Sequence, residues 1–509
     1  MIATGDWLAP RYNGQPFFDK PILFHQLQGI AMLLVGQNEL GARAVPALAA
    51  MALIGVTAWF AAVVTRTRDV GIVAGLLLTS SAGVFALARY AILDSLFTLF
   101  TFGGAALLTV AALHGRRSLQ WPGYFGIALG VLTKGPVALV LCGLTLLIAI
   151  AVDAEARRRL LGLRWVAGLM IVSVVSAPWF VYMYLRFGGA FVQGYVLDEN
   201  IRLFSGSRFG NQPGVWFYFQ ILATFLLPWT PVVAGRLLDD VRGALDGSRP
   251  DTFEVLLWSW TIAVVGFFSF STFKLDHYIF PAAPALCIVC ARAWDDLRTG
   301  DQRKHAAARV GLHLVGPLLL AVGLGFGYLL IERLDLPRAA MFIPGAIALC
   351  GAAMTVMLNL RGGRPGGVPW LSSVAAIVAY AGLIVFVVPA LEQRKVVHDV
   401  ALWVAQQAEV GDRIASFRLN RWNPAFRFYV DRPMTFLEDS GDAAAFLSGS
   451  GRFYCVMRRR AFDEFAAKGI PLQILHERDG LWATSGRALW RRREAPAQFV
   501  VVSRVSRPQ

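Results

Sequence analysis

Residues 94–113 read DSLFTLFTFGGAALLTVAAL and carry no charge after the opening Asp94. Twenty residues of α-helix are about 30 Å long, which is the thickness of the hydrocarbon core of a bilayer. The stretch therefore predicts a transmembrane helix with a single carboxylate at its first position.

Similar apolar runs recur through the first 390 residues, separated by Gly, Pro and clusters of Arg. The predicted spans are 44–64, 70–88, 94–113, 121–133, 137–152, 165–185, 213–234, 252–271, 278–292, 310–331, 339–358 and 368–390. We therefore expect an all-α polytopic membrane domain of about twelve transmembrane helices over residues 1–390, in which residues 1–43 form an extracytoplasmic interfacial segment.

The composition supports this class. Of the 509 residues, 56% are hydrophobic and 16% are charged, and the mean hydropathy is +0.54, whereas soluble domains carry about 25% charged residues. A soluble enzyme, a disordered chain and a fibrous repeat are thereby excluded. The net charge of +15 is read as loop charge and not as a nucleic-acid surface, because basic residues hold cytoplasmic loops in place. The five cysteines suggest no internal disulfide framework, and the Cys287/Cys290 pair in an apolar run is interpreted as packing.

The distribution of Lys and Arg between the loops predicts the orientation. Alternate loops hold seventeen of these residues, and the intervening loops hold eight. By the positive-inside rule the first set is cytoplasmic, as in a bacterial inner-membrane protein. Residues 1–43, the loop 186–212 and the tail from 391 are then expected outside the cytoplasm. A polar first segment on that side predicts a further transmembrane helix upstream of Met1.

The tail over residues 391–509 differs in composition from the spans. Helix-like and strand-like runs alternate there, at 393–408, 413–417, 426–430, 452–457 and 460–467. This alternation predicts a small extracytoplasmic α/β domain. The tail has no glycine-rich phosphate loop and no metal-ligand spacing, so the chemistry is expected in residues 1–390.

Two polar clusters near the expected outer surface provide the first candidate site residues. Asp19 and Lys20 stand in an aromatic-rich stretch, either as solvated charges of a surface helix or as a phosphate site in which Lys20 binds and Asp19 orients. Arg89 and Asp94 lie at the ends of two successive spans. They either pair with each other or leave Asp94 facing a substrate cavity, because a carboxylate that opens an apolar helix is costly without a partner or a cavity.

Other polar residues are expected at the same face. Lys134 precedes a Gly-Pro helix break, and the remaining candidates lie in two outer loops: Glu199, Asn200, Arg202, Lys274 and Tyr278. A transporter more often places such groups near the membrane midplane. An enzyme that acts on a lipid headgroup would place them at the surface.

In these residues the chain resembles the GT-C class of integral-membrane glycosyltransferases. The resemblance is greatest to bacterial lipid A 4-amino-4-deoxy-L-arabinose transferases, which share a pattern with protein O-mannosyltransferases. The matching motifs, in order over residues 1–290, are Gly5-Asp6-Trp7, Phe18-Asp19-Lys20-Pro21, Arg89 with Asp94, Thr133-Lys134-Gly135-Pro136, Glu199-Asn200 with Arg202 and Phe204, Pro228-Trp229, and Lys274-Leu275 with Tyr278 and Pro281. No single motif is specific, whereas their order and spacing are.

The resemblance implies an inverting transfer of a sugar from a polyprenyl-phosphate-linked donor to a hydroxyl of a lipid, glycan or protein. It implies that Lys20 contacts the lipid phosphate, that Asp94 is an acidic site residue and that Tyr278 lines the site. The catalytic candidates are Asp94, Lys20 and Asp19. The substrate-binding candidates are Arg89, Lys134, Glu199, Asn200, Arg202, Lys274 and Tyr278.

Two departures from the family pattern bear on activity. The family's expected catalytic base lies in an Asp-Glu pair after its first helix, and that loop would precede Met1. Its aminoarabinose branch has a glutamate and a histidine as a metal pair at the positions of Asp19 and Asn200. The asparagine argues against a bound divalent metal and against lipid A as the acceptor. A lipid-linked sugar transporter and a catalytically inactive relative are the alternative functions.

Overall fold

A computed structural model describes residues 1–2, 4–206, 213–248, 250–300, 305–333, 338–360, 365–419, 423–480 and 497–504. Two compact units are present in it. Unit 1 comprises residues 1–10, 16–325 and 343–380, and unit 2 comprises 11–15, 326–342 and 381–509. The predicted domain boundary at residue 390 stays a prediction.

Seven helices in the described part of the chain are long and apolar enough to cross a membrane. They are α2 (Glu39–Thr65), α5 (Asp94–Leu113), α9 (Trp165–Phe187), α14 (Thr252–Phe270), α16 (Ala306–Arg333), α17 (Phe342–Asn359) with η4 (Arg338–Met341), and the run of η5 (Pro365–Gly367), α18 (Val368–Gly382), η6 (Leu383–Val387) and α19 (Val388–Glu392). The chain is thus a multi-pass membrane protein, and the predicted all-α class of this part is confirmed.

Two further predicted spans are bent pairs of helices. The pair α3 (Arg68–Ser80) and α4 (Ala82–Ala88) bends by 67°, and the pair α12 (Phe217–Phe225) and α13 (Thr230–Leu245) bends by 119°. The last three predicted spans are α6 (Gln120–Lys134), α7 (Val137–Val152) and α15 (Ala283–Thr299), which have 15, 16 and 17 residues. Each predicted span is therefore helical, although these three are shorter than a bilayer ordinarily requires.

Shorter helical segments connect the spans. They are α1 (Leu23–Val35), η1 (Arg117–Leu119), α8 (Ala154–Leu161), α10 (Gly189–Phe191), η2 (Val192–Arg202), α11 (Leu203–Ser205) and η3 (Asp276–Ala282). The loop predicted at 186–212 is instead helical as far as Ser205, where the described segment nears its end. Its middle part, η2, is a π-helix, a form that is often found at functional sites.

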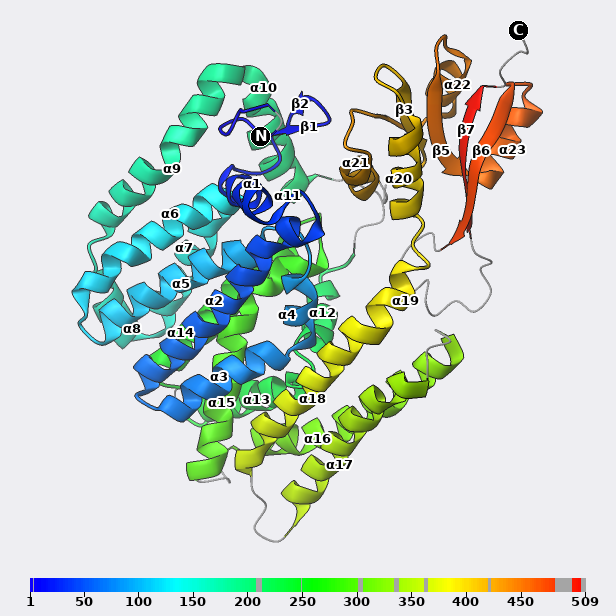
Figure 1. The fold of residues 1–509 in the computed structure, drawn as a ribbon. Helices are drawn as coiled ribbons and strands as arrows, with labels where there is room; N and C mark the ends of the chain where they lie inside the picture. The colour runs from blue at the N-terminus through cyan, green and yellow to red at the C-terminus, as the bar shows by residue number, and fades with distance from the viewer. Residues whose placement is uncertain are drawn as a thin grey trace. The chain divides into compact units, whose positions relative to one another are not determined.

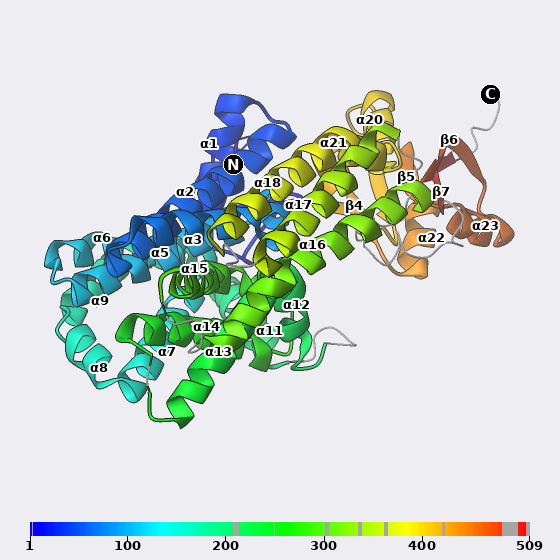
Figure 2. The ribbon, with the colours of Figure 1, turned by 90° about the horizontal axis from the view of Figure 1, so that it is seen from below.

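Small residues set the spacing of the helices that hold the site. The α5–α6 pair packs closely because glycines face each other: a Cβ atom added to Gly104 would lie 2.7 Å from the carbonyl oxygen of Gly123. Figure 1 shows α2, α5 and α6 side by side, and all three pairs α2–α5, α5–α6 and α6–α9 pack together. Figure 2 shows α16 alongside α17, where Gly351 approaches the backbone of Leu320.

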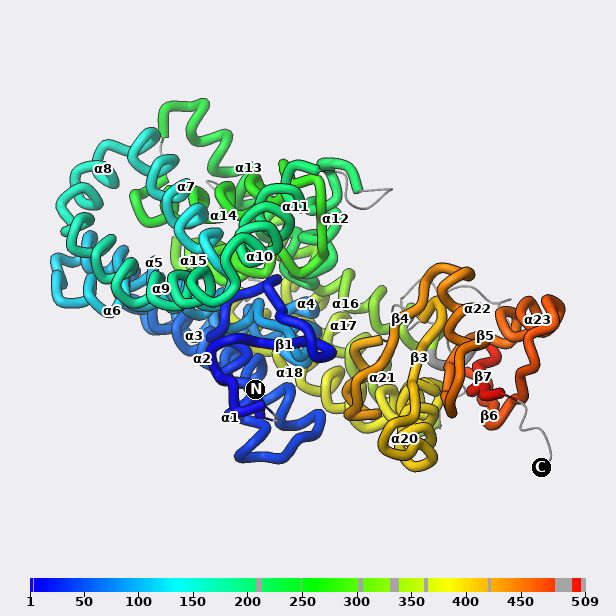
Figure 3. The backbone as a smooth tube through the Cα atoms, turned by 90° about the horizontal axis from the view of Figure 1, so that it is seen from above, coloured from blue at the N-terminus to red at the C-terminus, as the bar shows by residue number. Residues whose placement is uncertain are grey.

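Unit 2 confirms the predicted α/β domain. Its five-stranded sheet has the order β4 (Thr435–Leu437), β3 (Arg413–Phe417), β5 (Phe453–Arg458), β7 (Ala497–Arg504), β6 (Leu472–Gly480), as the tube in Figure 3 shows. β3 is parallel to β4 and β5, whereas β7 is antiparallel to β5 and β6.

Helices cover both faces of this sheet. α20 (Val397–Gln407) and α21 (Asn423–Val430) pack on one face, and α22 (Ser440–Ser448) and α23 (Arg459–Ala467) pack on the other. The central strand β5 therefore sends Tyr454 and Val456 into one core and Phe453, Cys455 and Met457 into the other. The sequence of a strand that is buried on both faces is a nearly continuous apolar run.

One predicted strand is wrong. Residues 426–430 belong to helix α21, because Phe426 and Val430 are four residues apart and both are buried in the same core. A spacing of four places two side chains on one face of a helix, whereas the aromatic and β-branched composition of the stretch is typical of a strand.

The N-terminal segment forms a short hairpin, and its residues 11–15 belong to unit 2. Its strands are β1 (Arg11–Tyr12) and β2 (Gln15–Pro16). Asn13 and Gly14 form its turn with φ angles of 51° and 83°, which these two residue types tolerate best. The Asn13 amide oxygen accepts from the Met434 backbone N–H at 2.9 Å, and its amide nitrogen donates to the Met434 carbonyl at 2.5 Å.

Candidate functional site

A cavity of about 90 Å³ in unit 1 collects half of the predicted site residues. It lies among the segment before α1, the α6–α7 break, η2, α11, the end of α14 and η3. Its lining is Lys20, Lys134, Val137, Glu199, Asn200, Leu203, Phe204, Phe267, Phe268, Ser271, Phe273 and Tyr278. The predicted candidates Lys20, Lys134, Glu199, Asn200 and Tyr278 are thus in one place.

Lys134 reaches this cavity from the last position of α6. Its Nζ donates to Asp94 Oδ1 at 2.6 Å, and the two side chains are only 7% and 3% exposed. Gly135 ends the helix with a φ of +88°, a conformation that glycine adopts without strain. Because Asp94 opens α5, the close packing of α5 against α6 delivers a buried, paired cation to the cavity.

Lys20 enters the same cavity from the N-terminal segment. Its Nζ donates to Glu199 Oε2 at 3.3 Å, and the side chains are 26% and 15% exposed. It also donates to the carbonyl oxygen of Asp19 at 2.8 Å. The cavity therefore has two ammonium groups, and each has a carboxylate beside it.

Aromatic rings form much of the remaining wall. The Lys134 Nζ lies 4.6 Å from the ring centroid of Tyr278 and 5.8 Å from that of Phe268. The rings of Phe204 and Phe267 stack with centroids 4.9 Å apart. An ammonium group close to ring faces is stabilised by cation–π attraction, and apolar walls next to cations suit a ligand with an anionic head and a hydrocarbon tail.

Asp94 lies behind Lys134 and does not line the cavity. The ion pair between Arg89 and Asp94, one of the two alternatives for these residues, is not formed. Asp94 pairs with Lys134, whereas the Arg89 guanidinium lies 5.5 Å from the Phe85 ring. The two residues are at neighbouring helix ends, but the α5–α6 packing gives Asp94 a nearer cation.

Three further candidates have their side chains elsewhere. Asp19 is exposed, and Arg202 pairs at 2.7 Å with Asp198 on the surface of η2. Lys274 is buried and donates to the carbonyl oxygen of Ser271. Burial lowers the pKa of the Lys274 ammonium group. Their assignment to the site stays a prediction.

Sequence reasoning missed His277 and the phenylalanines of the wall. His277 Nε2 is 3.7 Å from Asp94 Oδ2, and its Nδ1 is 3.2 Å from Asp276 Oδ1. Its position three residues after Lys274 was a usable signal. Phe267 and Phe268 had none, because phenylalanine is ordinary in apolar helices, whereas Phe204 was part of a family motif without being assigned to the site.

The positions of the family's metal pair do not offer a metal site. The Asn200 amide nitrogen donates to the Tyr195 carbonyl oxygen at 2.6 Å. No group of three or more His, Cys, Asp or Glu side chains that could hold a metal ion occurs among the residues described. We therefore derive no step through a metal.

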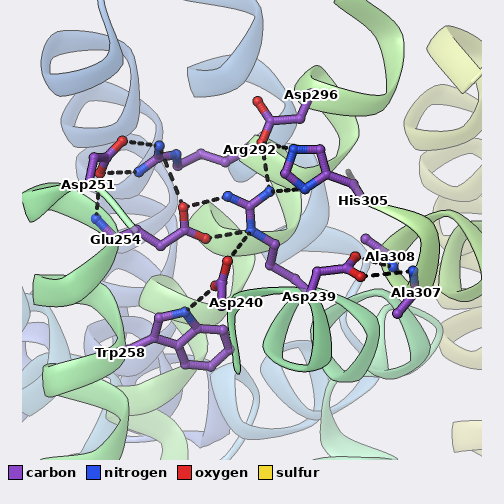
Figure 4. Close-up of polar contacts among 11 residues, drawn as sticks. Asp239, Asp240, Asp251, Glu254, Trp258, Arg292, Asp296, His305, Ala307 and Ala308 are labelled. Atoms are coloured by element: carbon purple, nitrogen blue, oxygen red, sulfur yellow. Dashed lines mark hydrogen bonds and ion pairs between the residues drawn. The ribbon is translucent and has the colours of Figure 1, made fainter. Parts of the chain in front are cut away.

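A larger cavity of about 580 Å³ adjoins a different cluster, which Figure 4 shows. Arg236 of α13 is 6% exposed and bonds both oxygens of Glu254 at 2.7 and 2.6 Å. It also contacts Asp240 at 3.2 Å and Asp296 at 2.6 Å, so it joins α13, α14 and α15. These charged groups satisfy one another, and we interpret this cluster as a structural connection.

Comparison with known proteins shows which families and folds this chain resembles. Residues 1–190 match the family model described as dolichyl-phosphate-mannose-protein mannosyltransferase. Two solved structures of ArnT from Cupriavidus metallidurans, one apo and one bound to undecaprenyl phosphate, superpose with TM-scores of 0.74 and 0.73. Each match covers 98% of this chain and 91% of the solved chain at 20% identity. This chain has the ArnT fold.

Curated relatives extend the similarity. The undecaprenyl phosphate-α-4-amino-4-deoxy-L-arabinose arabinosyl transferase of Aeromonas salmonicida is 29% identical over 63% of this chain, and that of Aeromonas hydrophila is 29% identical over 60%. The matches span 58% and 55% of those relatives, a little over half of their length. The similarity to aminoarabinose transferases that the motifs indicated is confirmed.

Proposed function

We propose that this chain is an inverting glycosyltransferase that uses a polyprenyl-phosphate-linked sugar at the extracytoplasmic face of the inner membrane. The observation that carries the proposal is the cavity with Lys20 and Lys134, which come from segments more than a hundred residues apart. The undecaprenyl-phosphate compounds named for its relatives have the charge and the tail that such a cavity suits.

In the proposed reaction the phosphate is the leaving group. The bond between the anomeric carbon and the phosphate oxygen breaks, and its electron pair stays on the phosphate. Lys20 and Lys134 stabilise the negative charge that develops there, and electrostatic stabilisation of this kind is usually the largest catalytic effect. The acceptor oxygen bonds the opposite face of the sugar.

The acceptor hydroxyl loses its proton to a carboxylate in this scheme. Glu199 is a carboxylate that lines the cavity. Asp94 acts through Lys134, because a paired carboxylate keeps a buried ammonium group charged and oriented. The acceptor is a lipid, glycan or protein hydroxyl.

Reconstituted transfer tests the proposal. The purified chain in liposomes is given undecaprenyl-phosphate-linked 4-amino-4-deoxy-L-arabinose with a labelled sugar, together with bacterial envelope lipid as the acceptor. Lys20→Ala should lower turnover about 30- to 150-fold, the loss expected for one charge-assisted contact. Lys395→Ala is the matched control, because Lys395 also pairs with a glutamate, Glu392 at 2.7 Å, in unit 2.

Two outcomes would count against the proposal. Undiminished turnover in Lys20→Ala would remove this lysine from the phosphate site. Movement of the labelled lipid between leaflets without any transfer would instead indicate a transporter.

A further inference from the structure

His277 is a half-buried residue beside the cavity, and its imidazole has no role in the proposed reaction. The ring lies between two carboxylates, with Nε2 3.7 Å from Asp94 Oδ2 and Nδ1 3.2 Å from Asp276 Oδ1. The His277 side chain is 21% exposed, the Asp94 side chain 3% and the Asp276 side chain 72%. The imidazole thus connects a buried carboxylate with an exposed one.

The two contacts have different hydrogen-bonding requirements. An ionised carboxylate only accepts, so the nitrogen that faces Asp276 carries a proton. The hydrogen bond from His277 lowers the pKa of the Asp276 carboxyl, which keeps that group ionised. In a neutral ring Nε2 then has a lone pair and no hydrogen to give to Asp94. The separation of 3.7 Å is too long for a hydrogen bond, in agreement with this tautomer.

Ligand binding would disturb the partner of Asp94. Lys134 lines the cavity, whereas Asp94 lies behind it. An anionic headgroup that attracts the Lys134 ammonium group weakens its contact with Asp94. A buried carboxylate that loses its cation is strongly destabilised. His277 is the second cation-forming group next to this carboxylate.

We propose that binding of an anionic lipid headgroup at Lys134 is coupled to uptake of one proton by His277, which then pairs with Asp94. The proton comes from the solvent and forms an N–H bond at Nε2, and no other bond changes. This inference rests on the proposed function, because it requires a phosphate ligand in the cavity. His277 is a positioning residue, since it acts on the ligand through Asp94 and Lys134.

The surroundings of the ring favour this uptake. Among the described residues, the charged groups that face the His277 ring are Asp276 from η3 itself and Asp94 from α5. Lys134 of α6 contacts Asp94 and is farther from the ring. The Tyr278 ring contacts the His277 ring edge-on, with centroids 5.1 Å apart. As Lys134 turns toward the ligand, the charge next to Nε2 becomes more negative, and a more negative surrounding favours the protonated ring.

Calorimetry in two buffers measures the proton directly. Undecaprenyl phosphate in detergent is titrated into the protein at pH 8 in HEPES and in Tris, which differ in their heat of ionisation. A free phosphate monoester is already almost fully ionised at this pH, so the ligand itself has little capacity to release a proton. The wild type should take up about one proton per ligand. The uncharged polyprenol should cause no uptake.

Variants assign the proton to a residue. His277→Gln keeps an amide close to the position of Nε2 but cannot become a cation, so uptake should vanish and affinity fall about tenfold. His398→Ala is the matched control, because His398 also lies beside an aspartate, Asp399 at 3.5 Å. It should behave like the wild type. A merely structural role of His277 would leave the proton uptake unchanged.

Three results would overturn the inference. Uptake that persists in His277→Gln places the proton on another group. Lipid phosphate binding without uptake in the wild type removes the coupling while the proposed function stands. A wild-type protein that binds no lipid phosphate contradicts the proposed function, and the inference falls with it.

Discussion

The buried Lys134–Asp94 pair gives the sharpest stability prediction. Its atoms are 2.6 Å apart, and both side chains are less than a tenth exposed. Among the described residues, Lys134→Met leaves the carboxylate with His277, at 3.7 Å, as its one ion-pair partner. Loss of one partner of a buried pair costs about 3–5 kcal/mol, whereas replacement of both partners by apolar residues is often neutral. We expect about 3 kcal/mol for Lys134→Met, because His277 compensates in part.

The assay is reversible unfolding in detergent, followed by tryptophan fluorescence. The double variant Lys134→Met/Asp94→Leu should recover most of the lost free energy of unfolding, although it should not transfer sugar. Arg158→Ala is the control, because Arg158 and Glu155 are also 2.6 Å apart but lie at the surface. It should cause no measurable change. Equal losses in the single and double variants would refute the account of Lys134 as a cation held by Asp94.

Three other substitutions separate the site from the rest of the fold. Arg236→Met should lower the free energy of unfolding by about 3 kcal/mol, because the buried Glu254 keeps only its longer contact of 3.5 Å with Arg292 among the described residues, and lipid phosphate affinity measured on the folded fraction should not change. Asn13→Ala removes two hydrogen bonds to the backbone of Met434, just before β4. The free energy of unfolding of unit 2 should fall by about 1–3 kcal/mol, which is measured as faster proteolysis of that unit, and the turnover of sugar transfer is measured beside it for comparison. Gly135→Ala should abolish binding of undecaprenyl phosphate, since its Cβ would lie 2.2 Å from the Tyr195 hydroxyl and its φ is +88°; binding at the wild-type level would show that the turn after α6 is not needed.

Local patterns predicted the helices well because a bilayer imposes a length and a composition. The runs at 94–113 and 252–271 coincide almost residue for residue with α5 and α14. The same patterns could not show that α12 and α13 bend by 119°, because a bend depends on the neighbouring helices.

The charged residues of the candidate site could be predicted from the sequence, whereas the pairs that they form could not. Lys20 and Glu199 are 179 residues apart, and Lys134 and Asp94 are forty apart. Pairing between residues so far apart in the chain depends on how the helices pack, and the spacing of residues along the sequence does not predict that packing. From the sequence Asp94 was expected either to pair with Arg89, the nearest cation along the chain, or to face a substrate cavity, and its partner Lys134 was not foreseen.

A structure determined with undecaprenyl phosphate tests the central claim most directly. The account predicts that the phosphate lies between the ammonium groups of Lys20 and Lys134, with the first isoprene units against Phe204 and Phe267. The Lys134 ammonium group should have moved away from Asp94, toward the phosphate. A phosphate bound elsewhere, for example beside Arg242 in the larger cavity, with the Lys134–Asp94 contact intact, would contradict the account.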